Sequence, residues 1–141
     1  MQFYSLVCCA REWGVALMTN GEFKLQMEKR TVAFSIMVLK LLRQVPASLE
    51  VRNIRDQVIR SATAVGANYR EANRAESRSD FVHKIAIVAK EASESEYWLI
   101  LLAELHPEIA ETGKVREEAG ELVRIFDKIR HSADNRGRSA P

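Results

Sequence analysis

Apolar residues recur every three or four positions in four separate segments of the chain, with polar residues between them. This spacing is the period of an α-helix, and no segment alternates polar and apolar residues for long enough to predict a strand. The pattern predicts four helices, which run from about Phe23 to Val45, from Ser48 or Glu50 to about Ala75, from Ser77 or Ser79 to just before Pro107, and from about Lys114 to His131.

One apolar stripe on each helix forms the predicted core. The stripes comprise Phe34, Met37, Val38, Leu41, Leu42 and Val45; Val51, Ile54, Val58, Ala62, Val65, Tyr69 and Ala72; Phe81, Ile85, Val88, Ala92, Ser95, Leu99 and Leu102; and Val115, Ala119, Leu122, Phe126 and Ile129. Four such stripes joined by short links are typical of an all-α protein, an antiparallel up-down-up-down four-helix bundle.

The two ends of the chain fit this pattern poorly. The first seventeen or so residues match no bundle helix, so residues 1–22 are either a flexible extension or the result of a translation start that truly lies at Met18 or Met27. The bundle is expected over 23–131. Residues 132–141 hold no apolar side chain large enough to anchor them, which predicts a disordered tail.

Composition favours one globular domain in the cytoplasm. The chain has 141 residues, of which 47% are hydrophobic and 28% charged. No apolar run approaches the ~20 residues that a transmembrane helix needs, and the first residues lack the basic start of a signal peptide, which predicts no membrane partner. Cys8 and Cys9 are neighbours, and they form neither a normal disulfide nor a zinc site.

Charge is distributed unevenly along the chain. Residues 52–90 contain eight basic and four acidic residues, a formal charge of +4, whereas residues 91–121 contain two basic and nine acidic residues, a formal charge of −7. The basic part can meet a polyanion, and it can also meet the acidic part of a second subunit.

No group of residues has the composition and spacing of a catalytic or metal site. Di-iron bundles use Glu-x-x-His motifs, and the nearest sequence here is a single Asp80-Phe81-Val82-His83. The serines lie within helical periods or at helix starts, and Gly66 is a single glycine rather than part of a phosphate loop. We therefore expect no enzyme activity, no metal and no cofactor.

Arginines on the second helix form the candidate nucleic-acid surface. At about 100° per residue, Arg52, Arg60, Arg70 and Arg74 fall on one side of the helix, away from the apolar stripe. Clustered arginines bind phosphates. The competing interpretation is an ordinary solvated face, because Asp56 and Glu71 lie among them. Tyr69 lies on the apolar side, so the face offers no evident platform for stacking bases.

A second set of residues is the candidate oligomer interface. It comprises Gly66, Glu91, Glu94, Glu96, Tyr97 and Trp98. A glycine in the middle of a helix suits the close approach of another helix, within the bundle or across a subunit boundary. The glutamates are either a solvated face or partners for arginines on a neighbouring helix or subunit. Tyr97 and Trp98 flank the core stripe, and such a second apolar face is typical of oligomers.

The stretch from Ser61 to Leu102 resembles the signature of the 23S rRNA intervening-sequence proteins, also called four-helix-bundle proteins. The resemblance is carried by Ser61, Gly66, Ala67, Asn68, Glu71, Ala72, Ala75, Glu76, Ser77, Asp80, Phe81, His83, Lys84, Lys90, Glu91, Ala92, Glu94, Glu96, Tyr97, Trp98 and Leu99. It implies a left-handed bundle that assembles as a homopentameric ring. The family also resembles the basic, nucleic-acid-associated accessory protein of diversity-generating retroelements.

Two functional hypotheses follow from the pattern and the resemblance. The first is a non-catalytic oligomeric scaffold or adaptor, with RNA or DNA as its candidate partner through the repeated arginine face. The alternative is a module that binds only another, unidentified protein and has no affinity for nucleic acid. An enzyme ranks third, because no catalytic constellation is present.

Overall fold

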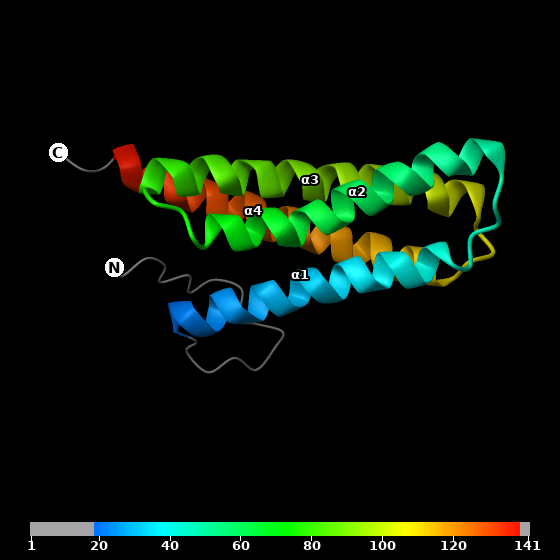
Figure 1. Ribbon diagram of the computed structural model, residues 1–141, viewed down its shortest axis with the longest axis horizontal. Coiled ribbons are helices and arrows are strands. Elements are labelled where there is room, and N and C mark those ends of the chain that lie inside the picture. The colour runs from blue at the N-terminus through cyan, green and yellow to red at the C-terminus, as the bar shows by residue number, and fades with distance from the viewer. Residues whose placement is uncertain (1–18, 139–141) are drawn as a thin grey trace.

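The computed structural model describes residues 19–138, which form four helices (Figure 1). The helices are α1 (Asn20–Leu42), α2 (Leu49–Ala72), α3 (Arg78–Leu105) and α4 (Glu111–Arg138). Residues 19–138 contain no strand, so the prediction of an all-α four-helix fold is confirmed. Of the extension expected at residues 1–22, residues 1–18 lie outside the described part of the chain, and residues 20–22 belong to α1.

Side-chain caps fix the starts of the first three helices. Ser48 accepts a hydrogen bond from the Val51 N–H, and Ser77 accepts one from the Asp80 N–H, so each is the N-cap of its helix. At α1 the cap is Thr19. Its hydroxyl accepts from the Glu22 N–H, and the Glu22 carboxylate accepts from the Thr19 N–H at 2.7 Å. This reciprocal capping box explains why α1 starts at Asn20 rather than at the predicted Phe23.

The capping box predicts that the start of α1 is sensitive to acid. The hydrogen bond from the Thr19 backbone lowers the pKa of the Glu22 carboxyl. A carboxyl with a lowered folded-state pKa stabilises the fold above its ordinary pKa of about 4.3, and this contribution is lost as the pH falls through the lowered value. The protection of amides near residue 22, taken relative to their intrinsic exchange rate at each pH, should therefore fall in acid, and Glu22→Gln should remove this pH dependence. An unchanged pH profile in Glu22→Gln would contradict the capping role.

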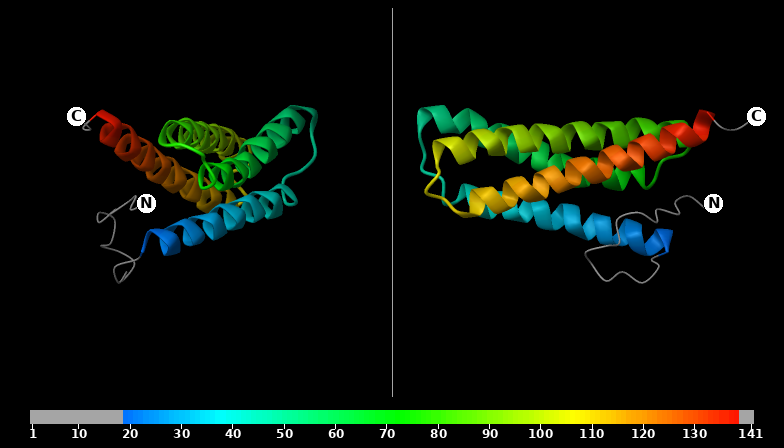
Figure 2. Two further views of the ribbon diagram at one scale, coloured as in Figure 1. Left: turned by 60° about the vertical axis from the view of Figure 1, so that its left-hand side comes forward. Right: turned by 180° about the vertical axis from the view of Figure 1, so that it is seen from behind.

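Contacts at defined positions join neighbouring helices. Between α1 and α2, Thr31 lies against Gly66, and the Ser35 hydroxyl lies 3.1 Å from the carbonyl oxygen of Ala62. Between α2 and α3, the hydroxyl oxygens of Ser61 and Ser95 lie 3.0 Å apart. The α3 and α4 helices also touch, Figure 2 shows all four helices alongside one another, and the up-down topology stays a prediction. The handedness of the bundle remains a prediction.

The predicted stripes form the core. Phe34, Val58, Leu99 and Phe126 have no exposed surface, and the Tyr69 and Phe126 rings pack with centroids 5.2 Å apart. Of all the predicted stripe residues, only Met37 and Phe81 are partly rather than fully buried, and both still pack against the core. The helical period therefore identified the buried side of every helix.

The predicted end of the fourth helix is wrong. The helix was expected to stop at His131, with disorder from residue 132, but α4 continues to Arg138. Ala133 is only 3% exposed, and its carbonyl oxygen accepts a hydrogen bond from the Arg78 guanidinium at the start of α3. A small alanine is enough to pack where two helices are close, which a search for large apolar anchors overlooks. The first turn of α4 also begins earlier than predicted, at Glu111.

Candidate nucleic-acid and interaction surfaces

The four predicted arginines are all exposed, but they differ in what they contact. Arg60 forms an ion pair with Glu94 on α3 and donates to Gln57 at 3.0 Å. The Arg70 guanidinium lies 4.0 Å from the Glu28 carboxylate on α1. Arg60 and Arg70 therefore mark the two edges of the α2 outer face, one toward α3 and one toward α1.

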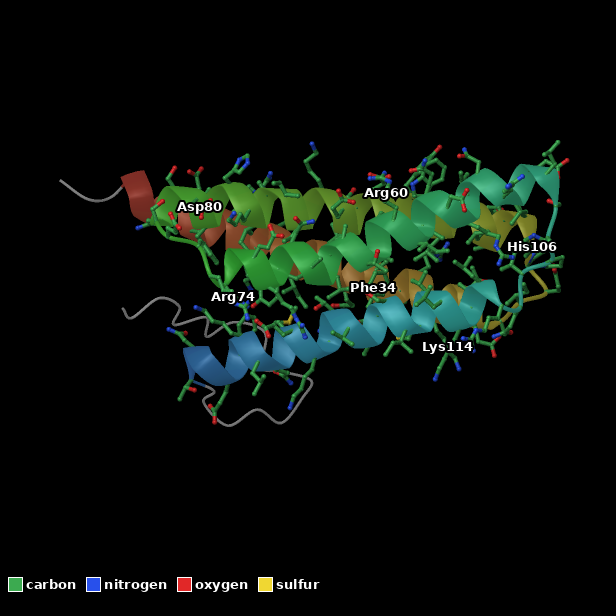
Figure 3. All side chains as sticks on the ribbon, in the orientation of Figure 1. Phe34, Arg60, Arg74, Asp80, His106 and Lys114 are labelled. Atoms are coloured by element: carbon green, nitrogen blue, oxygen red, sulfur yellow. The ribbon has the colours of Figure 1, made fainter. Side chains whose placement is uncertain are left out.

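Arg52 and Arg74 are the freer pair. Neither forms an ion pair with any residue in the described range 19–138. Figure 3 shows Arg74 just beyond the end of α2, on the side of α1, and Arg60 within α2, on the side of α3. The predicted face exists, but two of its four cations already have carboxylate neighbours.

A shallow depression beside the end of α2 has mixed charge. It is lined by Ala67, Arg70, Glu71, Arg74, Glu76, Asp80 and Lys84. Lys84 pairs with Asp80 at 3.4 Å, and the depression holds three cationic and three acidic side chains. The opposed charges make it a poor pocket for a single anion, so the extended face of α2 is the better candidate surface for a polyanion.

The three predicted interface glutamates have three different environments. Glu94 accepts from Arg60 and from the Trp98 indole N–H, the latter at 3.2 Å, so it is the predicted partner of an arginine on a neighbouring helix. Glu96 lies over Gly120 of α4, with Oε1 2.9 Å from the point where a Cβ on that glycine would sit. Glu91 has one buried carboxylate oxygen without a hydrogen-bond partner among residues 19–138.

Tyr97 and Trp98 lie on the outer side of α3. Their rings pack edge to face, with centroids 4.9 Å apart. Trp98 is partly buried against the core, whereas Tyr97 is 54% exposed. Ile100 and Leu105 are exposed on the same half of the helix. Tyr97, Ile100 and Leu105 together are named the α3 patch.

Gly66 lies inside the bundle rather than on its surface. A Cβ at this position would be 3.2 Å from the Thr31 hydroxyl oxygen and 3.4 Å from the Thr31 Cβ on α1. Of the two predicted explanations for this glycine, the close approach of α1 to α2 within one chain is the one that the structure contains. The prediction of Gly66 as an oligomer-interface residue is therefore corrected.

An apolar stripe on the outer side of α1 was not predicted. Leu25, Val32, Ile36 and Leu39 are 54%, 41%, 45% and 42% exposed, and they follow one another at steps of seven, four and three residues. This spacing keeps them on one side of the helix, opposite the core stripe. They are named the α1 stripe. The signal was present in the sequence, as a second apolar period within the same helix.

One cross-helix ion pair was also missed. Arg30 of α1 donates through Nε and Nη2 to both carboxylate oxygens of Glu118 on α4, at 2.6 and 2.9 Å. The Glu118 carboxylate raises the pKa of the Arg30 guanidinium. This bidentate pair ties α1 to α4, whose mutual contact is the least extensive among the touching helix pairs.

The histidines and serines of the described region do not form a reactive group. The His106 ring lies 3.0 Å from the Glu108 carboxylate. A hydrogen bond from the Glu108 backbone N–H, and then one from the His106 ring, lower the pKa of the Glu108 carboxyl. Ser61 and Ser95 are fully buried. Residues 19–138 contain no group of three His, Cys, Asp or Glu side chains placed to hold a metal ion. In the same range, no helix combines the length and apolarity needed to cross a bilayer.

The fold and its surfaces define an all-α four-helix protein whose conspicuous features lie on the outside of the helices. This chain belongs to the family of 23S rRNA-intervening sequence proteins, whose pattern matches residues 23–129. The predicted family resemblance is thereby confirmed. The further likeness to the retroelement accessory protein stays a prediction.

A solved structure is similar over most of the chain. It is the crystal structure of a protein with unknown function from the S23 ribosomal protein family of Bacteroides thetaiotaomicron. The two sequences are 29% identical, the TM-score is 0.63, and the match covers 73% of this chain and 96% of that one. A search of curated proteins found no match.

Proposed function

We propose that this protein is a non-catalytic scaffold that assembles with copies of itself and presents the outer face of α2 to nucleic acid. The observation that carries the nucleic-acid part is the run of exposed guanidinium groups from Arg52 to Arg74. At 1.5 Å per residue, this run extends over about 30 Å, the length of several successive phosphates along a strand.

Phosphate groups can compete for the arginines that already have carboxylate neighbours. Arg60 is 57% exposed at its side chain, as is Arg70, and ion pairs as exposed as these contribute only about 0–1 kcal/mol. Arg52 and Arg74 need no such exchange. A phosphate backbone can therefore contact all four side chains without a change in the fold.

Self-assembly strengthens a surface that is weak in one copy. The whole chain has a formal charge of only +2, so one monomer attracts a polyanion modestly. A closed ring repeats the α2 face once per subunit, and a single strand that touches several faces binds through multivalency. The pentamer that the family resemblance implies would supply five such faces.

Removing the two free arginines should reduce the salt dependence of binding. For Arg52→Ala/Arg74→Ala, the slope of log K against log salt concentration should flatten by about 0.7–0.9 for each phosphate that an arginine no longer neutralises in a bound subunit. Fluorescence anisotropy measures this slope with a labelled single-stranded RNA and with a labelled DNA duplex, at about 25 to 200 mM salt.

A matched control variant changes α4, the helix that lies diagonally opposite α2 in the bundle. Arg124→Ala/Lys128→Ala removes the same formal charge from α4, which lies across the bundle from the outer face of α2, and should leave the slope closer to that of the natural chain. The nucleic-acid proposal fails if neither RNA nor DNA binds at the lowest salt concentration, or if the Arg52/Arg74 variant keeps the natural slope.

The second candidate function is a module that binds only protein. The observation that favours it is the α3 patch, because exposed aromatic and aliphatic side chains are enriched in the centres of protein interfaces. Assembly without any RNA or DNA binding at low salt would favour this candidate over the first.

A further inference from the structure

The α1 stripe makes α1 apolar on two opposite sides. Phe34 and Val38 face the core at 0% and 1% exposure, while Val32 and Ile36 on the other side are more than two fifths exposed. A helix that is apolar all round is normally buried all round. The bundle covers only one side of α1, and the other side is left for a partner.

The α3 patch is a second apolar surface on a different helix. Tyr97, Ile100 and Leu105 are 54%, 40% and 51% exposed. Helices α1 and α3 each lie beside α2 and α4 but not beside one another. They are diagonal in the bundle, so the α3 patch of a chain cannot cover the α1 stripe of the same chain.

Opposite charges border the two surfaces. The part of the stripe from Val32 to Leu39 is flanked in sequence by Lys29, Arg30, Lys40 and Arg43, of which Arg30 pairs with Glu118, whereas Glu28 lies between Leu25 and Val32 and is 4.0 Å from Arg70 on α2. From residue 91 to residue 113 the sequence has six glutamates and neither lysine nor arginine, and two of these glutamates are already paired, Glu94 with Arg60 and Glu108 with His106. In the described part of the chain Lys29, Lys40 and Arg43 form no ion pair, and neither does Glu104 within the α3 patch region. The unpaired charges near the stripe from Val32 to Leu39 are therefore cationic, and the unpaired charge within the patch is the Glu104 carboxylate.

We infer that the α1 stripe of one copy packs on the α3 patch of a second copy, with Lys40 and its neighbouring cations beside Glu104. The inference rests on the self-assembly in the proposed function and names the surfaces that carry it. Stripe against stripe would bring cations together, and patch against patch would bring carboxylates together. Stripe against patch buries both apolar surfaces and pairs opposite charges.

This contact is head-to-tail, because it uses two different surfaces. An array of copies then has a free stripe at one end and a free patch at the other. These two surfaces meet when the array closes into a ring. At 1.5 Å per residue the stripe from Leu25 to Leu39 is about 21 Å long and the patch from Tyr97 to Leu105 about 12 Å, so they form the apolar centre of a contact, and surrounding polar side chains supply the rest of the roughly 800 Å² per partner of a standard interface. The arginine face of α2 is not part of this contact.

Charge reversal tests the pairing directly. We expect Lys40→Glu and Glu104→Lys each to raise the protein concentration needed for assembly about tenfold or more, because each places like charges across the contact. The double variant Lys40→Glu/Glu104→Lys reverses both partners and should restore assembly. Light scattering after size exclusion, at low and at moderate salt, measures the mass of the particle, which is compared with the 16.0 kDa of the monomer.

An apolar substitution supplies a second, independent arm. Ile36→Ser on the α1 stripe should shift the mass toward the monomer while far-ultraviolet circular dichroism keeps its helical signal. Leu49→Ser is the matched control, since Leu49 is 85% exposed and belongs to neither surface. It should leave the mass unchanged.

Each outcome distinguishes the inference from the proposed function. Assembly that persists in Lys40→Glu, Glu104→Lys and Ile36→Ser overturns the inference and leaves self-assembly standing through other surfaces. Loss of assembly in both single reversals without rescue in the double variant also overturns the pairing. A natural chain that stays at 16.0 kDa overturns self-assembly itself. Arg52→Ala/Arg74→Ala should keep the natural mass whether or not the chain binds nucleic acid.

Discussion

Leu99→Asp is expected to unfold the bundle. Leu99 has no exposed surface and lies in the C-terminal half of α3, where the core stripes of neighbouring helices meet. A carboxylate placed there without a partner costs several kcal/mol, and proteins of this size are stable by only about 5–15 kcal/mol in total. Circular dichroism should show loss of helix at neutral pH, or a large fall in the denaturant midpoint.

The same substitution on the surface is the control. Leu49 is 85% exposed in the first turn of α2, where an acidic side chain is favourable beside the free N–H groups. Leu49→Asp should therefore keep the natural denaturant midpoint. If Leu99→Asp kept it as well, position 99 would not lie in the core and the assignment of the α3 stripe would be wrong.

Gly66→Val is expected to destabilise the contact between α1 and α2. Even a Cβ at residue 66 would lie 3.2 Å from the Thr31 hydroxyl oxygen, and the two further methyl groups of valine have no room unless α1 moves away. Overpacking of this kind costs about 1–3 kcal/mol, although a mid-helix glycine is itself unfavourable. Chemical denaturation measures the change in the free energy of unfolding.

Two other glycines provide the comparison. No side chain or distant backbone atom lies within 4 Å of a Cβ built at Gly21 or at Gly113. Gly21→Ala and Gly113→Ala should leave stability unchanged or raise it by up to about 1 kcal/mol through helix propensity. A Gly66→Val protein as stable as these variants would show that α1 and α2 are not held close at Thr31.

The sequence was sufficient to predict the buried side of each helix. Val58, Leu99 and Phe126 recur at the helical period and are fully buried, because a helix in a small bundle must place its apolar side against its neighbours. The candidate residues on α3 were identified for the same reason, since Tyr97 and Trp98 flank a stripe that the period defines.

The contacts between helices could not be predicted in the same way. The pairs Arg60–Glu94 and Arg30–Glu118 depend on how far one helix is shifted along another, and periodicity within a helix does not determine that shift. The α1 stripe escaped notice because a single core stripe was sought on the first helix. Ala133 was overlooked because its small side chain carries little hydrophobic signal.

The mass of the natural chain in solution tests the central claim most directly. Sedimentation equilibrium at micromolar concentration and physiological salt should give one closed species several times the 16.0 kDa monomer, with five copies as the state that the family resemblance implies. A particle of 16.0 kDa over the whole concentration range would contradict the account, because the α1 stripe and the α3 patch would then remain exposed in the working protein.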